Sequence, residues 1–155
     1  MAFLLIKSNS FDSNFSIFSS LIRLLMVDIQ TKTEHIVLED NGLIYCTVLK
    51  GLYMDLSDAK ENLEAINTLA KGKRVPVLVD IRQSKGVSQK CRAYFAGDEA
   101  AQIQSACALL IESPLSKLIG NFFIGFNKTK FPTKLFTDES SARAWLSSFV
   151  VPQDT

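Results

Sequence analysis

The chain has 155 residues, of which 47% are apolar and 21% are charged, and its net charge is +1. This length supports one well-buried core but not two ordinary domains. The charge is balanced, and no basic run exceeds Lys71, Lys73 and Arg74, so nucleic-acid binding is not expected. No apolar run reaches the roughly 18 residues that span a bilayer, which argues against a transmembrane segment.

The three cysteines indicate whether the protein works in an oxidising or a reducing compartment. Cys46, Cys91 and Cys107 are widely spaced, and His35 is the single histidine that could assist them as a metal ligand. This pattern matches neither a zinc site nor a disulfide framework. We therefore predict a cytoplasmic protein, in a reducing compartment, that needs no metal and no cofactor.

Residues 1–25 differ in composition from the rest, because phenylalanines stand there among serines and asparagines. Apolar residues recur at helical spacing from Phe11 to Leu25, as in an amphipathic helix on a membrane surface or a partner. A signal peptide fits poorly, because no positive region precedes the short apolar run at Phe3 to Ile6. Three interpretations stay open for this leader: translation that begins at Met26, an amphipathic or disordered element, and an export signal. We assign residues 26–155 to the domain.

The first predicted elements form a β-hairpin. Glu34 to Glu39 alternates as a strand does, and Leu43 to Leu49 is rich in apolar and β-branched residues. Asn41-Gly42 between them is typical of a two-residue turn in which both residues take positive φ.

A helix and a buried strand follow the hairpin. Asp55 or Ser57 caps the helix and Gly72 ends it. The apolar face of this helix consists of Leu56, Ala59, Leu63, Ile66, Leu69 and Ala70. Val75 to Asp80 (VPVLVD) is an unbroken apolar run closing on a carboxylate, as in a strand buried on both faces. Such a strand needs helices on both faces, which indicates an α/β fold that binds ligands at the carboxyl edge of its sheet.

The later elements continue this alternation. Ser88 caps a predicted helix that runs to about Ala96, and Ile103 to Ile111 is predicted as an internal strand. Ser113-Pro114 starts a helix that runs to about Phe126. After a short strand at Thr133 to Phe136, Thr137 to Ser140 starts a last helix. The apolar residues of that helix are Ala142, Trp145, Leu146 and Phe149. The predicted order is β-β-α-β-α-β-α-β-α, with a mixed sheet.

This order, with the stretches VLVDIRQSKGVSQKCRAYF, ALLIESPLSKLIGNFFIGFNK and PTKLFTDESSARAWL, resembles the STAS domains. The amino-acid sequences of these three stretches are most similar to the uncharacterised bacterial family called STAS-like or SpoIIAA-like. The resemblance covers Lys32 to about Phe149. It implies a single STAS-like domain that binds a regulatory protein partner and is not an enzyme.

The anti-sigma-factor antagonists of this fold are switched by phosphorylation of a serine in an Asp-Ser-Ser/Thr-Gly motif after the central strand. The corresponding segment here is Gly86-Val87-Ser88-Gln89-Lys90, so the motif is absent. Ser88 falls near the motif's Asp, and Gln89 falls near its phosphorylated Ser. The resemblance therefore implies partner binding without the usual phosphoserine switch. Ser84 and Ser88 stay candidate phosphosites, because they lie in the right loop, with a loop residue and a helix cap as the alternatives.

The contact surface is predicted to be the loop from Arg82 to Lys90 with the adjoining helix. The candidate residues are Asp80, Arg82, Ser84, Lys85, Ser88 and Lys90. Positive charge gathers here and attracts an anion or an acidic partner, unless it marks only a solvated face; its sources are Arg82, Lys85, Lys90 and Arg92. Asp80 either ties down the loop or, in a third hypothesis, serves as the base of an uncharacterised enzyme.

A second hypothesis concerns the late aromatic residues. They are most simply core, but a crevice between the late helices and the sheet would hold a small apolar or lipid-like ligand. The candidates are Phe122, Phe123, Phe126 and Trp145. Aromatic residues left exposed would instead form a homodimer surface.

Overall fold

The computed structural model describes residues 17–18, 27–113 and 129–151. In chain order, the described elements are β1 (Val27–Gln30), β2 (Glu34–Leu38), β3 (Ile44–Val48), β4 (Tyr53–Met54), α2 (Leu56–Ala70), β5 (Val75–Asp80), β6 (Gly86–Val87), α3 (Gln89–Phe95), α4 (Asp98–Ile103), β7 (Gln104–Leu110), β8 (Thr133–Phe136), α6 (Glu139–Leu146) and the 3-10 turn η1 (Ser147–Phe149).

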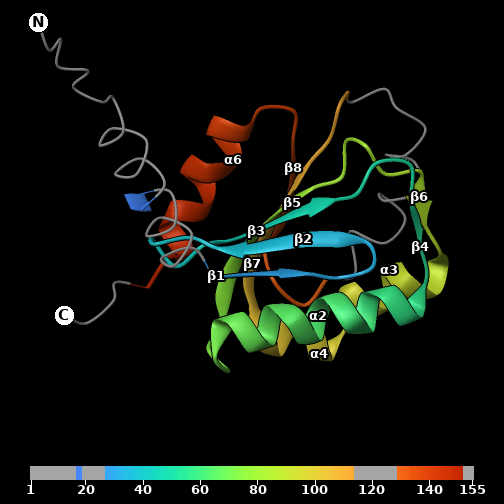
Figure 1. Ribbon diagram of the computed structural model, residues 1–155, viewed down its shortest axis with the longest axis horizontal. Helices are drawn as coiled ribbons and strands as arrows, with labels where there is room; N and C mark the ends of the chain where they lie inside the picture. Colours follow the sequence, from blue (N-terminus) through green and yellow to red (C-terminus); the bar gives the residue numbers. More distant parts are fainter. Residues whose placement is uncertain (1–16, 19–26, 114–128, 152–155) are drawn as a thin grey trace, which may run out of the picture.

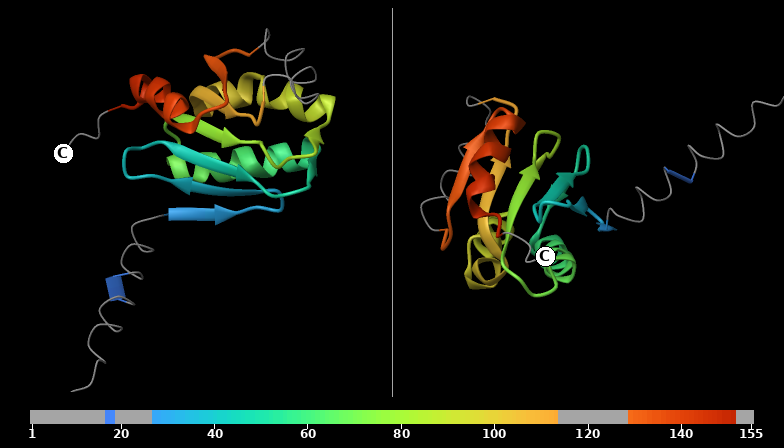
Figure 2. Two further views of the ribbon diagram at one scale, coloured as in Figure 1. Left: turned by 90° about the horizontal axis from the view of Figure 1, so that it is seen from above. Right: turned by 90° about the vertical axis from the view of Figure 1, so that its left-hand side faces the viewer.

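The strands form a six-stranded sheet in the order β1-β2-β3-β5-β7-β8, and β4 pairs with β6 in a separate ribbon. The first three strands are antiparallel, and β3, β5, β7 and β8 are parallel. Helices α2, α3 and α4 cover one face of the sheet and α6 covers the other (Figures 1 and 2). The predicted α/β class with a mixed sheet is therefore confirmed, and the predicted buried strand is β5, between β3 and β7.

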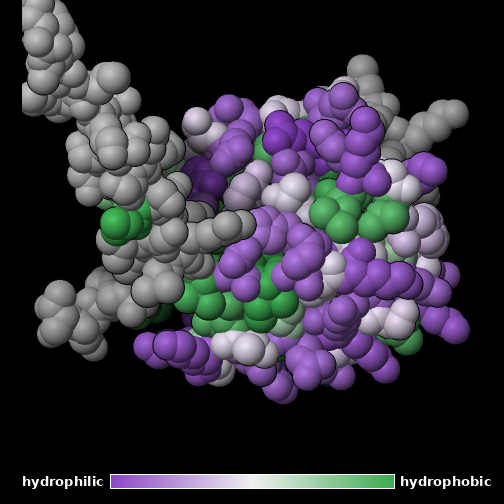
Figure 3. All heavy atoms as spheres, in the orientation of Figure 1, coloured by the Kyte–Doolittle hydropathy of each residue, from purple (hydrophilic) through white to green (hydrophobic). Residues whose placement is uncertain are grey.

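The described elements include several that the sequence prediction lacks: β1, the short strands β4 and β6, helix α4 and the turn η1. Strand β1 precedes the hairpin at the sheet edge, and Val27 on it is exposed. The face of the molecule seen in Figure 3 is mostly hydrophilic, with apolar areas between the polar side chains. Helix α4 occupies Asp98–Ile103, so the strand predicted from Ile103 begins one residue later, at Gln104. The helix predicted from Ser113-Pro114 to Phe126 lies outside the described residues.

The hairpin between β2 and β3 is confirmed, but the predicted two-residue turn is wrong. Glu39 N–H donates to Leu43 O, and Gly42 N–H donates to Glu39 O, each at 2.9 Å, so the loop has three residues, 40–42. Gly42 has a φ of 84°, whereas Asn41 is not among the described residues with positive φ. A three-residue hairpin loop needs one left-handed residue, which glycine supplies. Asn41 instead accepts Leu43 N–H through Oδ1.

Helix α2 is capped by Asp55, whose carboxylate accepts Leu56 N–H at 2.8 Å, while Asp58 bonds back to Asp55 N–H. Ser57 is not the cap. At the other end Lys71 takes a left-handed conformation just before Gly72. The predicted apolar face is buried apart from half-buried Leu56 and packs on the sheet; it also carries the buried polar residues Asp58 and Asn62.

The leader of residues 1–25 lies outside the described part of the chain, apart from Ile17 and Phe18, which are helical and exposed. A start of translation at Met26 therefore stays a prediction. Among the described helices, none combines the length and the apolar character needed to cross a bilayer.

Candidate functional site

Asp80 ends β5 at the carboxyl edge of the sheet and holds the loop that follows. Its carboxylate accepts three hydrogen bonds from Arg82: from the backbone N–H at 3.1 Å, from Nε–H at 2.9 Å and from Nη2–H at 2.6 Å. Burial raises the pKa of Asp80, but the hydrogen bonds and charge of Arg82 outweigh burial and hold that pKa below its ordinary value. A carboxylate that stays ionised and bound in this way is a poor general base, and its role in the structure is to fix the loop.

Ser84 fixes the same loop from inside. It is only 8% exposed, and its hydroxyl accepts Gly86 N–H at 3.1 Å. The loop backbone is joined to residues 51–54 by Gly51 N–H to Gln83 O and by Lys85 N–H to Leu52 O. The short parallel pairing of β4 with β6 extends this connection. Ser84 is therefore a structural residue of the loop, and a kinase would reach it only after the loop opens.

Ser88 joins two helix starts. Its Oγ accepts Cys91 N–H at 3.1 Å, which caps α3, and donates to Asp55 Oδ1 at 2.6 Å, which is the cap of α2. The Ser88 hydrogen bond is the main cause that lowers the pKa of Asp55. A phosphate on Ser88 would place negative charge beside the Asp55 carboxylate and separate the two caps.

A polar recess of about 520 Å³ lies beside the Asp80–Arg82 pair. Its lining comes from the carboxyl ends of β3, β5 and β7 and from the residue after β8: Thr47, Val48, Asp80, Arg82, Gln83, Ile111, Glu112 and Thr137. Sequence reasoning placed Asp80 and Arg82 at this edge but missed Thr47, Glu112 and Thr137. Their signal is topological, since the ends of neighbouring parallel strands meet at one edge once the strand order is known.

Of the predicted loop candidates, Asp80 and Arg82 line this recess. Lys85 and Lys90 are exposed, whereas Arg92 donates to Val87 O at 3.1 Å. The aromatic candidate Trp145 lies on α6, which covers the face of the sheet opposite helices α2, α3 and α4. There it packs between Phe136 and Phe149. The other three aromatic candidates, Phe122, Phe123 and Phe126, lie outside the described residues.

The remaining reactive side chains do not line this recess. His35, as predicted, is a strand residue, and its Nε2 is 2.8 Å from Asp28 Oδ2. Cys46, Cys91 and Cys107 are free and buried, and burial raises the pKa of both Cys91 and Cys107 to about 12, so these thiols are unreactive. Within residues 27–113 and 129–151, no three His, Cys, Asp or Glu side chains are grouped as metal ligands would be.

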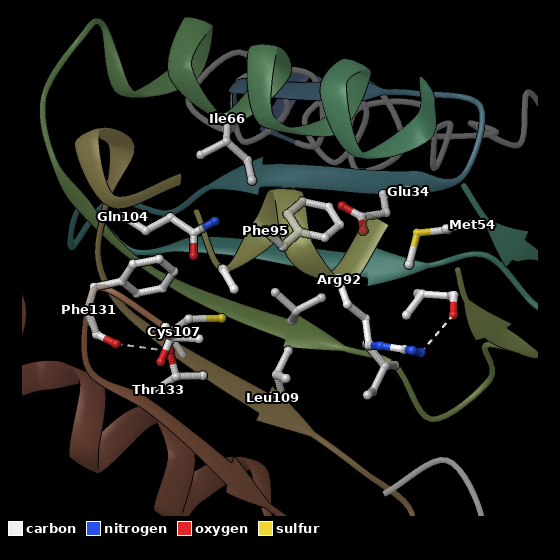
Figure 4. A pocket seen from close by; sticks show the side chains of 15 residues that line it. Glu34, Met54, Ile66, Arg92, Phe95, Gln104, Cys107, Leu109, Phe131 and Thr133 are labelled. Atoms are coloured by element: carbon white, nitrogen blue, oxygen red, sulfur yellow. Dashed lines mark hydrogen bonds between the residues drawn. The ribbon is translucent and has the colours of Figure 1, made fainter. Parts of the chain in front are cut away.

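A second hollow lies inside the molecule, between the sheet and helices α2 to α4 (Figure 4). Its volume is about 90 Å³, and apolar side chains such as Ile66, Phe95 and Leu109 form most of its wall. Glu34 is completely buried at one end, where burial raises its pKa to about 7 and hydrogen bonds with Asn62 and Cys46 offset part of that rise. The crevice predicted at the late helices stays a prediction, because most of its residues lie outside the described part of the chain; the cavity described here faces α2 to α4.

The strand order, the two helical layers and the polar carboxyl edge define an α/β domain of the mixed-sheet class. The chain belongs to the family described as Domain of unknown function (DUF7793), which matches residues 36–150. No curated protein matches the chain.

The solved structures that are similar to the chain include two proteins of unknown function. One is an uncharacterised protein of the DUF3478 family from Shewanella loihica PV-4, described as having a SpoIIAA-like fold; it is 16% identical, with 78% of this chain and 91% of that chain covered and a TM-score of 0.49. The other is a protein of unknown function from Arthrobacter sp. FB24, 28% identical, with 76% of this chain and 95% of that chain covered and a TM-score of 0.31. The fold class given above follows from the chain's own strand order.

Proposed function

We propose that this domain is a non-enzymatic regulatory module that binds an acidic surface of a protein partner at the edge loop, defined as residues 82–90. The observation that carries the proposal is that this exposed basic loop is held in one conformation. Asp80 and Ser84 bond it from within, and residues 51–54 bond it from the side.

A loop that is ordered before binding loses little conformational entropy in the complex, so more of the contact energy appears as affinity. Lys85 and Lys90 are exposed, and neither forms an ion pair with a described residue. Unpaired surface cations favour an acidic partner and speed its association. The resemblance of the sequence to STAS domains supports a regulatory role for such contact.

The chemistry of the edge supports binding over catalysis. In the recess, Arg82 fixes the carboxylate of Asp80, and the lowered pKa of Asp80 makes it unsuited to accept a proton. The hydroxyl of Ser88 donates to Asp55, the cap of α2, and accepts Cys91 N–H at the start of α3. No imidazole lies beside it in the described structure. Neither residue is therefore arranged as an activated base or nucleophile.

The test compares two charge-reversal variants in affinity capture from the source organism. Lys85→Glu/Lys90→Glu alters the edge loop, and the matched control Lys60→Glu/Lys73→Glu makes the same charge change on exposed positions of α2 and the turn after it. We expect a partner that wild type and control retain and that the loop variant binds at least about tenfold more weakly, measured by calorimetry. Equal binding of one partner by all three proteins would exclude the edge loop as the contact surface.

A further inference from the structure

Gln104 lines the internal cavity, and its carboxamide has an unpaired oxygen. The residue is 3% exposed, and its Oε1 is buried without a hydrogen-bond partner in the described structure. Its backbone carbonyl is occupied, because it accepts Arg74 Nη2–H at 3.2 Å. Buried amide oxygens are nearly always bonded, so an unpaired one at a cavity wall indicates a missing partner.

A register shift in the sheet explains how Gln104 reaches the cavity. Val75 pairs with Gln104 but Pro76 pairs with Ala106, so Ser105 is an extra residue in β7. Ala106 and the alternate residues after it pack toward α6, whereas Cys107 lines the cavity. If Ser105 took a regular place in the pairing, Gln104 would point toward α6; because the bulge takes up Ser105, Gln104 points to the cavity, where Figure 4 shows it beside Phe131 and above Cys107.

The rest of the wall selects against a charged ligand. The described lining is mostly apolar, and the two ionisable groups among it, the Glu34 carboxyl and the Arg92 guanidinium, both lie toward the Met54 end in Figure 4. Arg92 donates to Val87 O at 3.1 Å. A charged group placed beside Gln104, at the other end, would lose its hydration with no counter-ion next to it, so an uncharged body fits best there.

We propose that the internal cavity binds a small uncharged molecule with an apolar body and a hydroxyl group, and that Gln104 receives the hydroxyl. A hydroxyl both donates and accepts, so it satisfies the carboxamide through either of its polar atoms. The volume of about 90 Å³ is smaller than the roughly 150 Å³ that accommodates benzene, which limits the bound part to fewer than about six non-hydrogen atoms.

The test uses two isomers that differ in the donor. Both 1-butanol and diethyl ether contain four carbons and one oxygen, but only the alcohol has an O–H group. Each is titrated into the full chain, and backbone amide shifts are followed by NMR. We expect 1-butanol to shift the amides around Gln104 and Cys107, with a dissociation constant in roughly the millimolar range, and to bind about tenfold more tightly than the ether.

Two variants separate the hydrogen bond from the cavity. Gln104→Leu keeps the approximate volume and should bring the two affinities within about twofold, while raising the melting temperature because it removes an unpaired acceptor. Leu109→Phe fills the cavity and should abolish binding of both isomers. Absence of cavity shifts with 1-butanol in the wild type, or an unchanged preference in Gln104→Leu, would overturn the proposal.

The loop variant distinguishes this site from the proposed protein contact. The Lys85→Glu/Lys90→Glu variant should bind 1-butanol as the wild type does, because neither lysine lines the cavity. Loss of 1-butanol binding in that variant would contradict a cavity site that is separate from the edge loop.

Discussion

At the scale of single residues, Glu34 shows how the burial of one carboxyl group makes the stability of this fold depend on pH. Burial raises its pKa from 4.5 to about 7, so the folded protein holds this proton more tightly than the unfolded chain does. The stability that this proton provides is complete below about pH 4.5 and is lost as the pH rises through about 7. Above that range the folded protein carries the full cost of a buried carboxylate.

Glu34→Gln should remove this dependence, because glutamine stays neutral at every pH. We expect the free energy of unfolding of the variant, relative to wild type, to grow between pH 4.5 and 7 by up to about 3 kcal/mol and then to level off. Urea unfolding at pH 5, 6, 7 and 8 measures it. Glu64→Gln, an exposed change on α2, is the control. Parallel profiles for Glu34→Gln and wild type would show that the carboxyl is not buried as described.

Single residues also show where the sequence prediction stopped. The Asn41-Gly42 pair identified the hairpin, but only the pairing of Glu39 with Leu43 distinguishes a three-residue loop from a two-residue turn. Gln104 carries no sequence signal as a cavity residue, because its direction depends on an extra residue in the strand pairing. A polar residue before an apolar run reads as a strand end unless that pairing is known.

At the scale of elements, the starts of α2 and α3 are joined through one hydrogen bond, from Ser88 to Asp55. Ser88→Ala removes both this bond and the cap of α3, and should lower the free energy of unfolding by about 1 kcal/mol. In an Asp55→Ala background the same change should cost less, because the shared bond is already missing. Denaturant unfolding of the four proteins measures the coupling, with Ser57→Ala as the exposed control. Additive losses would mean that the two caps act independently.

A charged group at the same junction tests its link to function. Ser88→Glu places a carboxylate beside that of Asp55, and the repulsion should separate α2 from α3 and shift the edge loop. We expect weaker binding of the partner identified by affinity capture, while 1-butanol binding in the cavity persists. Ser57→Glu adds the same charge at an exposed position near the same helix start. A complex that Ser88→Glu leaves as strong as wild type would argue against the edge loop as the contact.

The elements that the sequence predicted well are those with a strong period or a strong cap. Helix α2 has an apolar stripe and the Asp55 cap, and β5 is an unbroken apolar run. Strand β1 has four residues with mostly exposed side chains, and α4 has six residues with a glycine cap that makes no side-chain bond. Such short elements are held by their neighbours, so the local sequence does not specify them.

At the scale of the whole molecule, Arg143 joins the first hairpin to the last helix. Its guanidinium donates to both carboxylate oxygens of Glu39, at 2.8 and 2.9 Å, and to Glu139 at 2.8 Å. Arg143→Lys keeps the charge but loses the paired hydrogen bonds of the guanidinium to the two carboxylate oxygens. It should lower the free energy of unfolding by about 1 kcal/mol. Hydrogen exchange should quicken in both the hairpin and α6. Faster exchange in α6 alone would show that the contact does not join these parts; Lys134→Arg on β8 is the control.

The carboxyl edge also belongs to this scale. Sequence reasoning located Asp80 and the loop after it, because one buried strand and its polar end are local features. The other polar residues of the recess come from three further chain segments, and they meet only through the order β3-β5-β7-β8. That order depends on which strands pair across long separations, and no local pattern encodes it.

The extra residue at Ser105 has a consequence for how this family can change over time. The bulge takes up Ser105 between the Val75–Gln104 and Pro76–Ala106 pairs, so the strand accommodates one residue without reversing the side chains on either side of it. Deletion of the Ser105 codon would therefore leave Gln104 on the cavity side and Ala106 on the α6 side. Related chains can lose or gain a residue here in one genetic step and keep the same polar group at the cavity wall, with no substitution in the core.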